Sequence, residues 1–169
     1  MQVFSTRYSF SQRFSVSAKE AFDWCTDYQQ GDLALMGEEG YRRITKLTRD
    51  TIILEELMVQ NGRRVRKVKL VKLNRYRNSW HNIHLKGPNR YSEFIYEIIS
   101  EGRRSSRLIF TGLLLVYSAK PIAQRNLREL ADRERVNDSR AWRRLASAMA
   151  KELHDNHTIS KPRRTGKLR

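Results

Sequence analysis

The sequence predicts a single α+β domain in which a curved, seven-stranded antiparallel sheet wraps around one long C-terminal helix, with two short helices between the first and second strands. Three observations predict this fold. Apolar and polar residues alternate over residues 8–16, which lead into a helix start, and six further segments with such alternation fill residues 41–117. From about residue 121 to 154, apolar residues recur at helical spacing. A length of 169 residues, 39% hydrophobic and 31% charged, suits one globular core.

The first strand and the first helix follow from adjoining patterns. In residues 8–16 the even positions are mostly apolar and the odd positions are Ser or Arg, which indicates a strand with one buried face. Ser17 and Glu20 have the spacing of a capping box, in which each side chain satisfies a free backbone amide at a helix start. The single cysteine, Cys25, continues the apolar face of this helix and is interpreted as a small core residue rather than a nucleophile.

A short helix and a meander come next. Glycines at 31, 37 and 40 leave room for one short helix over residues 32–36. The clearest strand alternation lies in residues 93–101, where glutamates occupy one face and apolar or aromatic residues occupy the other. The side chains expected to face water are Glu93, Glu97 and Glu101. Those expected to face the interior are Phe94, Tyr96 and Ile98.

Two strands depart from simple alternation. In residues 63–74 the apolar parity changes between Val68 and Val71, and a bulge near Leu70 would reconcile the two halves and bend the sheet. Residues 107–117 are apolar on both parities. One face must meet the interior, and we expect the other to cover a helix or the partner subunit of a dimer.

The last helix and the tail complete the order. Pro121 suits a first helical turn. Residues 137–139 interrupt the helical period. We expect one long helix, with a kink or a break into two segments there as the alternative, and Asp138 or Ser139 as a second cap. The domain covers residues 1–157, and residues 158–169 form a basic tail that we expect to be disordered.

A cavity is expected between sheet and helix, in preference to a filled core, because one helix cannot cover so much sheet. The expected apolar lining is Phe94, Tyr96, Ile98, Phe110 and Leu114. The polar candidates, chosen by parity, are Gln12, Glu56, Asn82, His84 and Tyr96. Glu56 is either a buried acid whose pKa burial raises, suited to proton transfer, or, as the favoured interpretation, an exposed strand glutamate beside Glu55.

The formal net charge of +16 indicates an anionic partner or simply a basic soluble surface. A basic stretch without acids lies on and around one strand. The residues assigned to contact an anionic surface are Arg63, Arg64, Arg66, Lys67, Lys69 and Lys72. Tyr76 and Trp80 lie close by, but no RNA-binding signature accompanies them, so an anionic membrane or phosphate surface is favoured over RNA or the ribosome.

Catalytic and metal motifs are missing from the sequence. It holds no Gly-rich phosphate loop, no Ser-His-Asp arrangement and no paired-cysteine motif. His81 and His84 would point to opposite faces of a strand, and His154 and His157 lie where the last helix should fray. We therefore predict no cofactor and no metal. Without a signal peptide or a long apolar run, a cytoplasmic protein is expected.

The stretch Phe14–Trp24, followed by Thr26–Tyr28, has the form of a first strand that runs into a first helix, and Ser92–Tyr96 with Glu101–Gly102 has the form of a later hairpin. Together with the order of elements over residues 3–155, these segments resemble the START-like superfamily, which includes the Bet v 1 allergens, polyketide cyclases and coenzyme Q-binding proteins. The resemblance implies a helix-grip fold and the binding of lipids, sterols, quinones or polyketides, and no particular reaction.

Three functions are consistent with these observations. The favoured one is non-catalytic binding or transport of a hydrophobic small molecule in an internal cavity. The second is an enzyme of the polyketide cyclase or aromatase kind, in which a polar cavity residue moves protons. The third is a ribosome- or nucleic-acid-associated module that uses the basic face.

Overall fold

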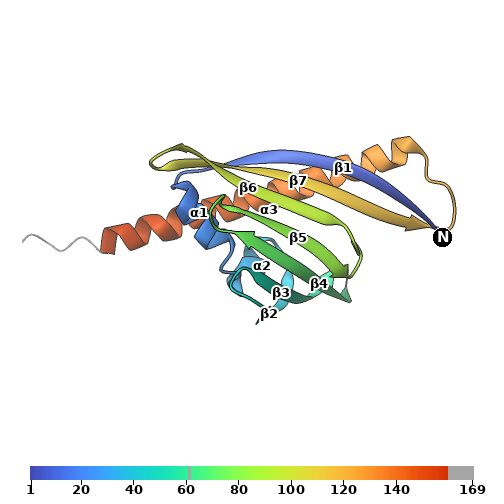
Figure 1. Ribbon diagram of the computed structural model, residues 1–169, viewed down its shortest axis with the longest axis horizontal. Helices are drawn as coiled ribbons and strands as arrows, with labels where there is room; N and C mark the ends of the chain where they lie inside the picture. The colour runs from blue at the N-terminus through green and yellow to red at the C-terminus, as the bar shows by residue number, and fades with distance from the viewer. Residues whose placement is uncertain (61, 160–169) are drawn as a thin grey trace, which may run out of the picture.

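The computed structural model describes residues 1–60 and 62–159 and confirms the predicted architecture (Figure 1). Seven antiparallel strands form one sheet in the order β1-β7-β6-β5-β4-β3-β2, so the last six strands make a meander and β1 adds to its final strand. The elements are β1 (Gln2–Phe14), α1 (Ala18–Cys25), α2 (Gly31–Leu35), β2 (Glu39–Lys46), β3 (Thr51–Gln60), β4 (Arg63–Asn74), β5 (Ser79–Lys86), β6 (Glu93–Gly102), β7 (Ser105–Ser118) and α3 (Gln124–Ile159).

The helices lie on the concave side of the sheet. Figure 1 shows α3 running behind the curved sheet along the direction of β1 and β7. Among the strands, β1 packs most closely against α3, whereas α1 contacts β6 and β7 and α2 contacts β2 and α3. Because α3 is seated toward the β1 side of the sheet, the inner faces of β3, β4 and β5 are left to border a space.

The inner face follows the predicted parity. Phe94, Ile98, Phe110 and Leu114 are buried and Tyr96 is half-buried, while the glutamates of β6 lie on the opposite face. The capping box of α1 is also present: the Ser17 hydroxyl accepts from the Glu20 amide at 3.3 Å, and the Glu20 carboxylate accepts from the Ser17 amide at 2.9 Å. Both features were predictable because they depend on neighbouring residues only.

Two predictions for the C-terminal region are wrong. α3 is one continuous helix, so Asp138 is not a second cap; its carboxylate accepts a hydrogen bond from the Tyr8 hydroxyl at 2.5 Å instead. The helix begins at Gln124, after Pro121, and the carbonyl of Ala123 accepts the amides of Asn126 and Leu127. The predicted basic tail lies, from residue 160 on, outside the described residues. No helix in the described part of the chain is long and apolar enough to cross a membrane.

The bulge predicted in β4 lies elsewhere. β4 keeps an unbroken register with β3 from Arg63 to Lys72. The irregularity is in its pairing with β5, where Val68 lies opposite Lys86 and the next residue, Lys69, lies opposite His84, so that the extra residue belongs to β5. Consequently the odd-numbered residues of β4 all point to the concave side, which decides the chemistry of the site.

Candidate functional site

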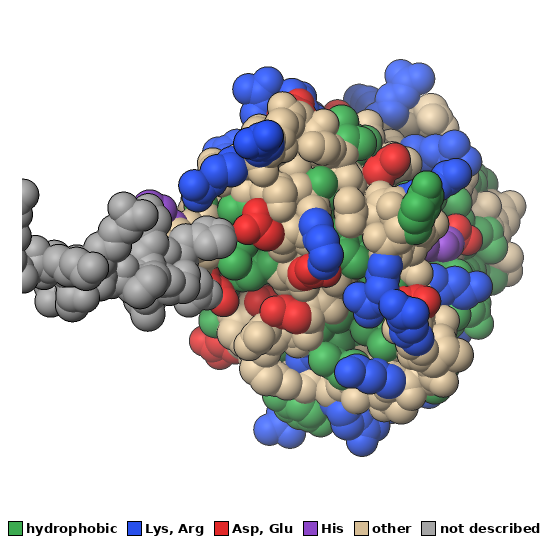
Figure 2. Space-filling view, turned by 60° about the vertical axis from the view of Figure 1, so that its left-hand side comes forward, with side chains coloured by type: hydrophobic (Ala, Val, Ile, Leu, Met, Phe, Trp, Pro, Cys, Tyr) green, Lys and Arg blue, Asp and Glu red, His purple; other side chains and the backbone are tan. Residues whose placement is uncertain are grey.

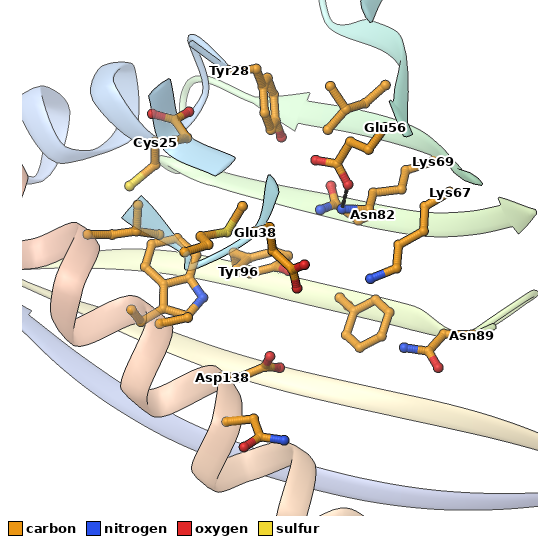
Figure 3. Close-up of a pocket in the computed structure, with 18 of the residues that line it drawn as sticks. Cys25, Tyr28, Glu38, Glu56, Lys67, Lys69, Asn82, Asn89, Tyr96 and Asp138 are labelled. Carbon is orange, nitrogen blue, oxygen red and sulfur yellow. Dashed lines mark ion pairs between the residues drawn. The ribbon is translucent and has the colours of Figure 1, made fainter. Parts of the chain in front are cut away.

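A cavity of about 660 Å³ lies between α3 and the concave face of the sheet (Figure 3). Its lining comes from every helix and from the inner faces of β1 through β6, and the segments that precede β2 and β6 contribute Met36, Glu38, Pro88 and Asn89. Two groups of side chains give this cavity two chemically different walls.

The aromatic wall consists of Trp80, Phe94, Tyr96 and Trp142. Trp80 and Tyr96 stack with ring centroids 4.6 Å apart and planes within 3°. Trp142, from α3, lies 5.7 Å from the Tyr96 ring and 6.2 Å from the Trp80 ring. Since such ring pairs are stabilised by both burial and quadrupole contacts, this wall is a rigid apolar surface.

The ionic wall consists of Arg42, Glu56, Lys67 and Lys69, from β2, β3 and β4. One Glu56 oxygen, Oε1, accepts from Arg42 Nε at 3.1 Å and Nη2 at 2.8 Å. The other, Oε2, lies 2.6 Å from Lys69 Nζ, and Figure 3 marks this ion pair. Arg42 also donates to the Asp32 carboxylate at 3.0 Å. The wall is thus a chain of alternating charges held inside the fold.

Burial and charge compete in the ionic wall. Burial by itself would raise the pKa of Glu56, but the charges of Lys69 and Arg42 hold that pKa at about 2. For Lys67, burial and then the neighbouring Lys69 charge lower the pKa. Glu56 therefore stays ionised at any ordinary pH.

The favoured sequence interpretation of Glu56 is wrong. Glu56 is only 1% exposed, although an exposed strand glutamate was expected. The alternative, a buried acid with a raised pKa, is also wrong, because two cations reach the same carboxylate. The neighbouring Glu55 is the outward residue; it pairs with Arg43 and Arg66, each at 2.6 Å.

The basic stretch does not form the single outer surface that was expected. Lys67 and Lys69 line the cavity, whereas Arg64, Arg66 and Lys72 lie on the opposite parity of the same strand. The reason is the uninterrupted period of two in β4. Figure 2 shows Lys and Arg side chains spread over one face of the molecule with acidic side chains among them, so on that face the positive charge is not gathered in one patch.

Asn82 and His84 line the cavity from β5, as their parity predicted. Burial, and then the charges of Lys69 and Lys67, lower the pKa of His84 to about 3, so the ring is neutral. Four buried polar atoms at the cavity have no hydrogen-bond partner among the described residues. One is Glu56 Oε2, which forms the ion pair with Lys69; the other three are Tyr28 Oη, Asn82 Oδ1 and His84 Nδ1. Buried polar atoms are rarely left without a partner, so these three indicate where a ligand or water would bind.

The opposite side of the cavity is formed by α3. Asp138 points from this helix toward the cavity, where burial raises the pKa of its carboxyl, and it accepts the Tyr8 hydroxyl. Burial, together with the Asp138 charge, likewise raises the pKa of Tyr8. The two side chains therefore tie β1 to the middle of α3.

The predicted lining is only partly right. Phe94 and Tyr96 face the cavity, but Ile98, Phe110 and Leu114 are buried in the core and do not line it. Gln12 does not line it either, since its side chain donates to the Arg13 carbonyl. The lining residues that sequence reasoning missed include Tyr8, Tyr28, Arg42, Trp80, Asp138 and Trp142, together with the inward position of Lys67 and Lys69. The sequence did hold a signal for two of them: Trp80 lies on the inner parity of β5, and Trp142 lies on the apolar stripe of α3.

No family model matches the sequence, and no curated protein matches it. Solved structures do match. They include the Zhui aromatase/cyclase from Streptomyces sp. R1128, with a TM-score of 0.74 and 10% identity over 89% of this chain and 96% of that chain. The chain has the START/Bet v 1-like fold.

Two further neighbours share this fold. A START superfamily protein from Mycobacterium smegmatis has a TM-score of 0.67 and 14% identity, covering 86% of this chain and 97% of that chain. Norcoclaurine synthase from Thalictrum flavum, solved in complex with dopamine and hydroxybenzaldehyde, has a TM-score of 0.66 and 12% identity, covering 95% of this chain and 91% of that chain. At these identities the likeness establishes the fold alone.

Proposed function

We propose that this chain binds a mostly apolar, ring-containing small molecule in the cavity between α3 and the sheet, without acting on it. The observation that carries the proposal is the cavity of about 660 Å³. Pockets of roughly 300 to 1,000 Å³ bury most of the surface of a drug-sized ligand.

The aromatic wall supports a flat ligand in particular. The rings of Trp80, Tyr96 and Trp142 meet at distances of 4.6 to 6.2 Å and offer a preformed apolar surface for a further ring. A quinone or a polyketide-like aromatic suits this surface better than an unbranched lipid chain. The norcoclaurine synthase neighbour, solved with two aromatic molecules, is consistent with such a ligand.

The ionic wall supports binding rather than catalysis. Glu56 was the sharpest candidate for proton transfer, yet Arg42 and Lys69 engage both of its oxygens and its pKa is about 2. A general base or acid works best when its pKa lies near the operating pH. Glu56 is therefore assigned a structural role in the proposal.

Native mass spectrometry of the purified protein, with extraction of whatever co-purifies, tests the proposal directly. A fluorescence titration with the neutral aromatic probe N-phenyl-1-naphthylamine should give a stoichiometry near one to one. Ala141→Trp places an indole in the cavity from α3 and should weaken binding of this probe at least about tenfold.

Ser147→Trp is the matched control, because it adds the same indole at an exposed position of the same helix. The control should bind the probe like the parent. Unchanged affinity in a folded Ala141→Trp protein would place the probe outside the cavity and contradict the proposal.

A further inference from the structure

We propose that the cavity ligand is an organic anion, an apolar ring-containing body with one carboxylate or similar oxyanion, and that Lys67 of the ionic wall binds the anionic group. This inference rests on the proposed function and specifies the ligand class. It follows from the pairing pattern of the ionic wall, from the confinement of the Lys67 side chain and from unpaired polar atoms that line the same cavity.

The pairing pattern leaves Lys67 as the cation available to a ligand. Glu56 lies directly opposite Lys67 in the register of β3 and β4. The two oxygens of this carboxylate are nevertheless engaged by Arg42 and by Lys69. Of the ion pairs formed within residues 1–60 and 62–159, none includes Lys67. Lys67 is half-buried, and the charges of Glu38, Glu56 and Asp138 reach it without forming an ion pair with it. A half-buried ammonium without a direct ion pair has lost part of its hydration, and an anionic ligand would offset that cost.

The backbone around Lys67 directs its side chain inward. The turn before β6 crosses close to β4 at this point: a Cβ added to Gly87 would fall 3.2 Å from Lys67 Cγ and 3.0 Å from the Arg66 carbonyl oxygen. Gly87 also has a φ of +110°, a conformation that other residues rarely adopt. The stem of Lys67 is thus enclosed on that side, and Figure 3 shows its ammonium extending into the cavity.

Two further buried polar atoms of the same cavity are available to an oxyanion, one of them on His84, which the charge of Lys67 reaches. His84 lies opposite Lys69 in the register and is 7% exposed, with Nδ1 unpaired among the described residues. Tyr28, also 7% exposed, has an unpaired hydroxyl under the same condition, on the side of the cavity where Arg42 lies over its ring. A hydroxyl and a neutral imidazole in its Nδ1–H form each donate one hydrogen bond, as a carboxylate requires.

The acids that line the cavity do not indicate a cationic ligand. Asp32 and Glu56 are paired with Arg42, and Asp138 accepts the Tyr8 hydroxyl. Glu38 faces the cavity from the segment before β2, and Glu134 lines it from α3. A cationic ligand held by these two acids is the competing possibility, and the experiment below distinguishes it.

The test compares two probes that share one aromatic body. The anionic probe is 8-anilinonaphthalene-1-sulfonate, and the neutral one is N-phenyl-1-naphthylamine. The wild-type protein should bind the anion about tenfold or more tighter than the neutral probe. Lys67→Met should remove this preference by weakening binding of the anion, and retained binding of the neutral probe reports that the variant is folded.

Lys72→Met is the matched control, since it removes the same charge from the outer face of the same strand. It should retain the preference for the anion, and Lys67→Gln should repeat the Lys67→Met result. Three results would each overturn the inference. The wild type binds the two probes with equal affinity, the preference for the anion survives in Lys67→Met, or a naphthyl amine cation binds more tightly than the anion. If the inference about Lys67 fails but the neutral probe binds and Ala141→Trp blocks its binding, the proposed function stands. If Ala141→Trp changes the binding of neither probe, the proposed function itself fails.

Discussion

The aromatic wall and the ionic wall of the cavity are built on the same plan but stabilised in different ways. Both consist mainly of inward-pointing residues on neighbouring antiparallel strands, and α3 adds Trp142 to the aromatic wall. Trp80 and Tyr96 face each other across β5 and β6, as Glu56 and Lys67 do across β3 and β4. The aromatic side chains are stabilised by leaving water, whereas the charged ones lose hydration and depend on one another. The comparison teaches that an inward position fixes where a side chain lies, not what it costs to bury.

We expect the largest loss of stability from a substitution at the centre of the ionic wall. Glu56→Gln removes the charge that Arg42 and Lys69 share, and it should lower the free energy of unfolding by about 4 kcal/mol, because breaking a buried ion pair leaves uncompensated charge inside. Urea unfolding at neutral pH measures the change. Glu55→Gln, on the outer face of the same strand, should have a far smaller effect; equal effects would mean that the ionic wall is not a buried network.

The pH dependence of the same variant sharpens the comparison. The pKa of Glu56 is lowered from 4.5 to about 2, so its ionised form stabilises the fold fully above about pH 4.5, and this stabilisation is lost as the pH falls toward 2. The difference between these pKa values corresponds to about 3 kcal/mol. The gap between the wild type and Glu56→Gln should therefore narrow by about that amount between pH 5 and pH 2 in urea unfolding. A gap that stays constant over this range would show that the charge of Glu56 is not the stabilising feature.

The aromatic wall should respond differently. Trp142→Ala removes the ring that joins α3 to Tyr96, Trp80 and Phe14, at centroid distances of 5.7, 6.2 and 6.3 Å. We expect a loss of about 3 kcal/mol in the free energy of unfolding, from lost apolar burial and the void left behind. Unlike the loss in Glu56→Gln, this loss should be the same at pH 7 and pH 4. Arg143→Ala, at an exposed position of the same helix, is the control and should lower the free energy of unfolding only slightly. If Trp142→Ala lowered it as little as the control does, α3 would dock by other residues.

The fold and the aromatic wall could be predicted from the sequence because they depend on local periodicity. The alternation of β6 placed Phe94 and Tyr96 inside, and the helical stripe placed Trp142 on the inner face of α3. The same parity placed Ile98 inside but did not reveal that it lies in the core and not on the cavity surface. Which inward residues the helices cover depends on tertiary docking, which strand periodicity does not encode.

The ionic wall was missed, because charged residues on strands are ordinarily assigned to the solvent face. That rule fails where charges of both signs meet on neighbouring strands. A signal was present: in β3 Glu56 lies between the apolar residues Leu54 and Met58 on the inner parity, and Lys67 and Lys69 occupy the inner parity of the adjoining strand. Parity compared across two strands, and not within one, would have placed the three side chains together.

We expect the smallest loss of stability at Tyr8, which takes part in both ring packing and a polar contact. Tyr8 belongs to the aromatic cluster, with its ring 5.3 Å from Phe110, but its hydroxyl donates to Asp138 at 2.5 Å. Tyr8→Phe keeps the ring and should cost about 1.5 kcal/mol, because it leaves the Asp138 carboxyl without this donor. In an Asp138→Leu background the same substitution should cost only a few tenths of a kcal/mol, since the acceptor is already gone. Urea unfolding of the four proteins closes this cycle. Equal costs in both backgrounds would show that the hydroxyl stabilises the fold by some contact other than Asp138, and that β1 is joined to α3 by ring packing alone.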